Sequence, residues 1–240
     1  MFSGIYNQQM TWAGLVSEER LLHDREFREE ALNVARAIMR NVRRNIETIV
    51  ERLHARNYCF IHPDSAYVPP PNDATKWADD LANLGVYLPI SYRAFQEVVG
   101  SVNLMGTDNS WPKSGYSGVG PSETWETDPL VVEGDKNYIL NELEDWSNWT
   151  KEKEPSEHFP FTVSFAPDDL HKANISGGPA YAIPVSRPSV DCLVLHERHC
   201  MSFVAYLRNA FQWGGFPGFE LIQNAPEGFL AEMRRDLLPV

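Results

Sequence analysis

Four residues able to do acid, base or metal chemistry lie in the last third of the chain. Asp168 and His171 stand three positions apart, and His196 and His199 stand three apart within the run HERH. Two zinc ligands on one helix face need a spacing of four, as in HExxH, so HERH is one residue short. A metal-dependent or acid/base hydrolase that uses these four residues stays open as an alternative.

Other catalytic patterns fail when the residues are compared with what the chemistry needs. The run GYSGV at 115–119 ends in Val where a nucleophile elbow has Gly. The run GVG at 118–120 continues as PSE, which departs from the dinucleotide-binding fingerprint. The cysteines include no CxxC pair. We therefore expect a protein that is not an enzyme and that has no catalytic residue, metal ion or cofactor.

Tryptophans and carboxylates gather in one segment. Residues 121–157 contain eleven Asp and Glu and three Lys, a local balance of −8, and four tryptophans lie in or beside this segment. Large aromatic rings are typical of residues that dominate protein interfaces. A solvated acidic loop and tryptophans buried over a sheet remain alternatives. We predict these partner-binding residues: Trp111, Glu123, Trp125, Glu126, Asp128, Glu133, Asp135 and Trp146.

The overall composition restricts the class of partner. The chain has 240 residues and a formal net charge of −12, which repels nucleic acid and anionic membranes and favours a basic protein. The first residues lack the features of a signal peptide, and no apolar stretch approaches the roughly 20 residues that span a bilayer. We expect a cytoplasmic protein with three reduced and mostly buried cysteines, Cys59, Cys192 and Cys200.

Helices are expected where apolar residues recur at steps of three and four. The longest, Ser17–Arg56, lacks Pro and Gly, and shorter helices are expected at Asp73–Leu84, at Ser91–Val99 and after Met201. The long helix must bury its single stripe against the rest of the domain or against a second copy. The stripe consists of Phe27, Ala31, Val34, Ile38, Val42, Ile46, Ile49 and Leu53.

Short apolar runs separated by turn residues predict strands. A short strand is expected at Tyr58–Ile61, before the main sheet. Helices followed by strands and a last helix predict an α+β fold, with an antiparallel or mixed sheet of about five strands flanked by helices. We divide the chain into an N-terminal helical extension, 1–56, packed on an α+β domain, 57–240. The five strands are expected at Val102–Gly106, Pro129–Val132, Phe161–Phe165, Ala180–Val185 and Cys192–Leu195.

Several runs resemble the SUKH superfamily in their order and rough spacing, over about residues 77–213. LPISYRAF at 88–95 is similar to its LPxxYxxF helix start, and FAPDD at 165–169 to its strand end. SGGPAY at 176–181 is similar to its Gly-rich turn, and SFVAYL at 202–207 to its closing helix. The chain departs from the family in VGSVN at 99–103, where Asn-Gly is usual, and in its long N-terminal helix.

The SUKH superfamily includes fungal regulators of cell-wall synthesis and bacterial immunity proteins that neutralise toxins. The resemblance implies an α+β protein-binding scaffold without a shared catalytic residue. We therefore predict an immunity-type protein or adaptor that engages a basic toxin or regulatory protein through an acidic, Trp-rich surface. Besides the hydrolase, a structural homodimer formed through the N-terminal helix is the second alternative.

Overall fold

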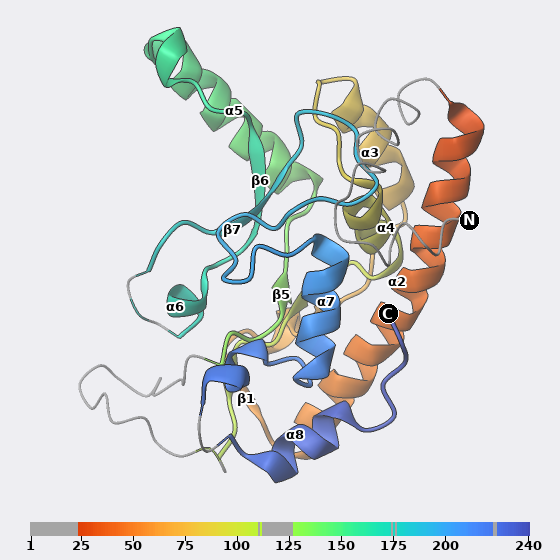
Figure 1. The fold of residues 1–240 in the computed structure, drawn as a ribbon, viewed down its shortest axis with the longest axis vertical. Coiled ribbons are helices and arrows are strands. Elements are labelled where there is room, and N and C mark those ends of the chain that lie inside the picture. The colour runs from red at the N-terminus through yellow and green to blue at the C-terminus, as the bar shows by residue number, and fades with distance from the viewer. Residues whose placement is uncertain (1–23, 110, 112–126, 174, 176, 223–224) are drawn as a thin grey trace.

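The computed structural model describes residues 24–109, 111, 127–173, 175, 177–222 and 225–240, and it combines helices with short strands (Figure 1). The predicted α+β class is confirmed, and so is the long N-terminal helix. The expected start of that helix at Ser17 lies outside the described residues.

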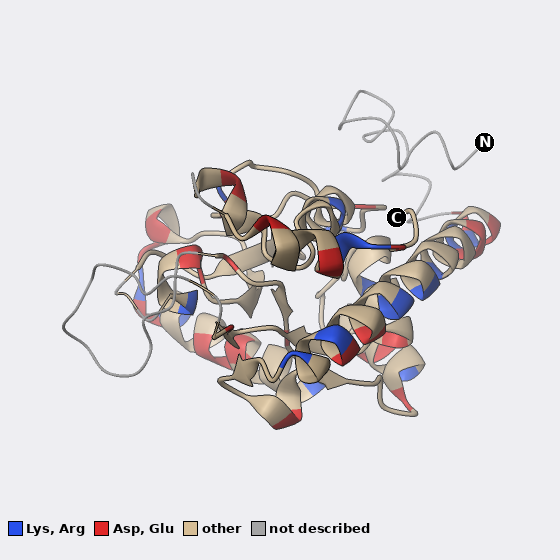
Figure 2. Cartoon of the chain, turned by 90° about the horizontal axis from the view of Figure 1, so that it is seen from below, with Lys and Arg blue, Asp and Glu red and all other residues tan. Residues whose placement is uncertain are grey.

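Helix α2 (Arg25–Ala55) supplies a large part of the core and packs chiefly against α4 (Ile90–Val98). Asp24 caps its start, because the carboxylate accepts a 2.9 Å hydrogen bond from the Phe27 N–H. Lys, Arg, Asp and Glu residues recur along the helix (Figure 2). Most of the predicted apolar stripe is buried within this chain, whereas Val34 and Ile38 are partly buried and pack at the edge of the core. The buried residues are Phe27, Ala31, Leu32, Ala35, Met39, Val42, Asn45, Ile46, Ile49 and Leu53.

The last residues of the chain lie along α2 and are held by its side chains. Asn45 is buried, and its Oδ1 accepts a 2.7 Å hydrogen bond from the Leu238 N–H. Its Nδ2 donates to the Leu238 carbonyl at 2.9 Å, and Asn41 Nδ2 donates to the Pro239 carbonyl at 2.9 Å. The buried amide of Asn45 therefore has the partners that an apolar surrounding requires.

The shorter predicted helices are confirmed within a few residues, as α3 (Ala74–Ala82), α4 and α7 (Phe203–Gln212). Gly100 follows α4 with φ of 93°, a conformation that glycine adopts without steric cost. A Cβ at this position would lie 2.2 Å from the Val68 carbonyl oxygen. Gly100 therefore ends the helix and also allows the backbone after α4 to approach the backbone at Val68 closely.

The strands form three small antiparallel sheets, so the predicted single sheet of about five strands is wrong. The run Cys192–Leu195 makes isolated bridges to Ala182 and Ser202 and no longer ladder. The Glu133 N–H donates to the Phe165 carbonyl at 2.8 Å and so links two of these sheets by a single bond. The sheets are β1 (Cys59–Phe60) with β4 (Gly106–Thr107), β2 (Tyr67–Val68) with β3 (Ser101–Asn103) and β5 (Val131–Val132), and β6 (Thr162–Ala166) with β7 (Tyr181–Pro184).

The remaining helical elements were not predicted. They are α5 (Lys136–Glu152), α6 (Asp169–Lys172), α8 (Glu227–Arg234) and the 3₁₀ turns η2 (Pro63–Ser65), η3 (Pro155–Glu157) and η4 (Pro217–Leu221). The expectation of mostly buried cysteines is also wrong, because Cys59 and Cys200 are exposed and Cys192 is buried. None of the described helices has both the length and the apolar character needed to cross a membrane.

Candidate protein-binding surface

Helix α5 leaves most of its apolar residues near the surface. Asp135 caps the helix by accepting a 2.8 Å hydrogen bond from the Tyr138 N–H. All seventeen residues of α5 are described, and Ile139 alone is buried. Figure 1 shows the helix extending away from the other helices, beside β6. Leu140, Leu143 and Trp146 are partly buried and pack against the core, so α5 is anchored along one side and is otherwise close to solvent.

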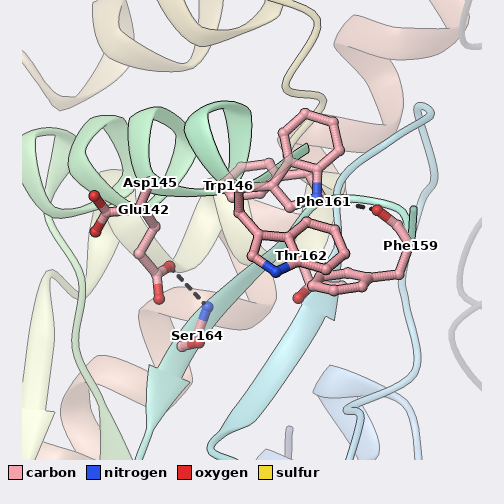
Figure 3. A pocket seen from close by; sticks show the side chains of 8 residues that line it. Glu142, Asp145, Trp146, Phe159, Phe161, Thr162 and Ser164 are labelled. Carbon is pink, nitrogen blue, oxygen red and sulfur yellow. Dashed lines mark hydrogen bonds between the residues drawn. The ribbon is translucent and has the colours of Figure 1, made fainter. Parts of the chain in front are cut away.

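Four aromatic rings line a groove of about 350 Å³ between α5 and the segment that leads into β6 (Figure 3). The ring centroids of Trp149 and Phe159 lie 4.5 Å apart, and those of Trp146 and Phe161 lie 5.7 Å apart. Trp146 Nε1 donates a 3.0 Å hydrogen bond to the Phe159 carbonyl, which holds this segment against the helix. Phe159 remains 53% exposed, so the groove is open to another molecule.

Two carboxylates, Glu142 and Asp145, line the same groove. Glu142 accepts a 3.0 Å hydrogen bond from the Tyr138 hydroxyl and a 3.1 Å hydrogen bond from the Ser164 N–H. Both donors are neutral, so they orient the carboxylate without compensating its charge. Asp145 is exposed and has neither a hydrogen-bond nor an ion-pair partner among the described residues. The groove therefore combines aromatic faces with uncompensated negative charge.

Tyr138, which donates a hydrogen bond to Glu142, titrates above its ordinary range. Burial and the charge of Glu142 raise the pKa of Tyr138 to about 12. Residues 135–157 contain seven acids and three lysines, a local balance of −4. Of these lysines, Lys136 pairs with Asp80 at 2.5 Å and Lys151 donates to Asn148. Neither lysine is directed at the groove carboxylates.

The predicted partner-binding residues occupy different parts of the structure. Trp146 lines the groove, and Asp135 is exposed as the cap of α5. Glu133 is partly buried and accepts a 2.9 Å hydrogen bond from Asn103 Nδ2. Three further predicted residues lie outside the described part of the chain: Glu123, Trp125 and Glu126.

Trp111, which was predicted to lie on the binding surface, is a core residue with 7% exposure. Its ring centroid lies 5.2–5.7 Å from those of Tyr58, Phe216, Phe219 and Phe229, in edge-to-face arrangements. Such contacts stabilise the fold and remove the ring from a partner's reach. The prediction failed because its partners are far away in sequence.

Asp128 was also predicted on the surface and is instead buried among paired charges. Lys172 Nζ donates a 2.6 Å hydrogen bond to Asp128, and both side chains are at most 1% exposed. The Tyr181 hydroxyl donates to Asp128 at 3.3 Å, and the Lys172 ammonium lies 4.4 Å from the Tyr181 ring centroid. Arg198 lies 3.8 Å from the same carboxylate. A charge taken out of water needs partners of this kind, which is why Asp128 can lie inside.

The residues of the hydrolase alternative are divided between separate pairs. Asp168 caps α6 and pairs with His171 Nδ1. Burial opposes ionisation of Asp168, but its hydrogen bonds with His171 lower the pKa of Asp168 below its ordinary value. The HERH run forms a loop, with His196 exposed. No group of three or more His, Cys, Asp or Glu side chains in the described residues could hold a metal ion.

His199 lies between two carboxylates of different segments. Its Nδ1 is 2.8 Å from Glu197 Oε1, and its Nε2 is 2.6 Å from Glu220 Oε1. Burial disfavours the imidazolium, but the hydrogen bond to Glu197 and the charges of both glutamates raise the pKa of His199 above its ordinary value. A protonated ring offers an N–H to each carboxylate, so His199 ties the HERH loop to η4.

Sequence reasoning missed most of the groove. The lining residues absent from the predicted set are Glu142, Asp145, Trp149, Phe159, Phe161, Thr162 and Ser164. A signal existed for the helix, because positions 142, 146 and 149 recur at steps of four and three and so share one face. No comparable signal marks Phe159, which reaches the groove from a loop.

Comparisons with known proteins give no relative for this chain. No family model, no curated protein and no solved structure matches it. The resemblance to the SUKH superfamily therefore stays a prediction, and the geometry of the described residues carries the functional argument.

Proposed function

We propose that this chain is a protein-binding module that engages a basic partner through the surface of α5. The observation that carries the proposal is the groove, in which four aromatic rings adjoin two carboxylates without a cationic partner among the described residues. Aromatic anchors and complementary charges supply much of the binding energy at protein interfaces. The net charge of −12 attracts a basic protein over longer distances and accelerates encounter.

An immunity-type protein or adaptor is the role that fits this surface best. Such a protein acts by occupying its partner and needs no reactive centre of its own. A nuclease toxin is basic because it must bind phosphates, so its surface complements the acids of α5. The resemblance of residues 77–213 to the SUKH superfamily implies the same kind of role.

Charge reversal on α5 tests the proposal. One variant carries Glu144→Lys, Asp145→Lys and Glu152→Lys, three exposed acids of α5. Its matched control reverses three exposed acids elsewhere, Glu51, Asp64 and Asp73, and so has the same net charge. The probe is a labelled, Trp-free peptide of arginine, leucine and glycine, with its affinity measured by fluorescence anisotropy at low and physiological salt.

We expect the α5 variant to bind this peptide about 30-fold or more weakly than the wild type, because it reverses one charge that lines the groove and two others on the same helix. The control should bind within about threefold of the wild type, since its changes act only over longer, screened distances. Equal losses in the two variants, or no binding by the wild type, would contradict the proposal.

A further inference from the structure

We propose that the α5 groove binds the guanidinium group of an arginine from the partner, between the aromatic rings and the Glu142 and Asp145 carboxylates. This inference rests on the proposed function and names the chemical group that the surface recognises. The ligand is therefore a basic peptide segment with an accessible arginine, rather than basic charge in general.

The aromatic walls suit a planar cation. Trp146, Trp149, Phe159 and Phe161 present ring faces and edges to one groove, and tryptophan is the ring that attracts cations most strongly. A guanidinium is planar and weakly hydrated, so it stacks on such rings at a lower desolvation cost than an ammonium group. The hydrogen bond from Trp146 Nε1 to Phe159 fixes the indole before a ligand arrives. Less conformational freedom is then lost on binding.

The carboxylates supply the polar half of the site. Glu142 is oriented by the Tyr138 hydroxyl and the Ser164 N–H, and neither donor neutralises it. Asp145 lines the groove without a partner among the described residues. Glu142 and Asp145 lie three positions apart on α5, and the five N–H donors of a guanidinium can bond more than one acceptor, whereas a lysine ammonium offers a compact point charge. The arrangement therefore favours arginine over lysine.

Three peptides test which chemical group the groove binds. They share a glycine, serine and leucine background and differ at one position, which holds arginine, lysine or citrulline. Citrulline has the shape of arginine without its charge. Binding is followed by tryptophan fluorescence and by the NMR shifts of the indole N–H groups of Trp146 and Trp149. We expect affinity for the arginine peptide to exceed that for lysine about threefold and that for citrulline about tenfold. Equal affinity for arginine and citrulline would overturn the inference.

A matched pair of variants separates the groove from the general acidity of α5. Asp145→Asn removes a charge that lines the groove, and Glu144→Gln removes an exposed charge from the same helix outside it. We expect D145N to weaken binding of the arginine peptide about tenfold and E144Q less than about twofold. Binding of the citrulline peptide should not change in either variant, and circular dichroism checks that both fold.

Two failures are distinguishable. If D145N and E144Q weaken binding equally, the acidic surface binds without a specific groove, so this inference fails and the proposed function stands. If the wild type binds neither the arginine peptide nor the longer basic peptide, both fail together.

Discussion

The buried charges around Asp128 and the exposed charges of α5 are treated in opposite ways by the fold. In the interior, Asp128 meets Lys172 at 2.6 Å and Arg198 at 3.8 Å. On α5, Glu142 receives two neutral donors, and Asp145 receives none among the described residues. The Asp128 charge, which folding removes from water, is thus compensated within the chain, whereas no cation of the described residues pairs with the carboxylates of the groove.

The tryptophans follow the same division. Trp111 packs among four aromatic rings and is 7% exposed, whereas Trp146 and Trp149 line an open groove. Local sequence is similar around these rings, since acidic and small polar residues surround each of them. Stability and binding should therefore respond to different substitutions, and this separation can be tested.

The largest expected effect is at Trp111. We predict that Trp111→Ala lowers the free energy of unfolding by about 4 to 5 kcal/mol, because it leaves a cavity among four rings. Trp149→Ala should cost only about 1 kcal/mol, since this ring is partly exposed. Urea denaturation of both variants measures the difference. Similar losses of stability would show that Trp149 supports the fold as much as Trp111 does.

The second-largest effect on stability is expected for the buried ion pair of Lys172 and Asp128. We predict that Lys172→Met lowers the free energy of unfolding by about 3 to 4 kcal/mol, because it strands the Asp128 carboxylate in the interior. Adding Asp128→Asn should recover part of this loss, and a double-mutant cycle measures the coupling. The variants that remain folded should bind the arginine peptide as the wild type does; weaker binding would show that the two regions are not independent.

A smaller effect is expected from His199, and it depends on pH. Its folded-state pKa is raised, so its contribution is fully present below the unfolded-state pKa and is lost as pH rises through the folded-state pKa. We predict that His199→Gln costs about 1 to 2 kcal/mol at acidic pH, where the imidazolium bonds both glutamates. The cost should shrink toward alkaline pH. Thermal unfolding across this range checks the slope, and a cost that grows with pH contradicts the bridging role.

The smallest effect on stability is expected at Asp145. We predict that Asp145→Asn changes the free energy of unfolding by less than about 0.5 kcal/mol, because the carboxylate is exposed and has no partner among the described residues. Chemical denaturation, run beside the peptide titrations, measures this change. A larger loss of stability would mean that Asp145 stabilises the fold, as Asp128 does, and is not reserved for binding.

The sequence predicted individual helices and strands better than it predicted which of them pair or pack together. The spacing of apolar residues located α2, α3, α4 and α7, since each buries a stripe that repeats along the helix. The runs at β6 and β7 were also found, but the sheet was not, because pairing depends on contacts between distant segments. Helix α5 was not predicted, because the acidic composition of this segment indicated a solvated loop and outweighed the helical spacing of its aromatic residues.

The candidate site could be predicted only where local sequence decides it. Trp146 was found because acid and tryptophan adjoin there. Trp111 and Asp128 were misplaced because their burial depends on Phe216 and Lys172, which are far away in sequence. Composition describes what a residue offers to its surroundings, and long-range packing decides whether solvent reaches it.

Asn45 and Leu238 are joined across 193 positions, so a bond of helix α2 is completed by a segment that is synthesised much later. Until Leu238 has left the ribosome, the buried amide of α2 has no backbone to bind. At roughly 5–20 residues per second, that interval is on the order of ten to forty seconds. The apolar side of α2 packs chiefly on α4, which is made much earlier, so it is the polar amide of Asn45 that waits for the arrival of Leu238.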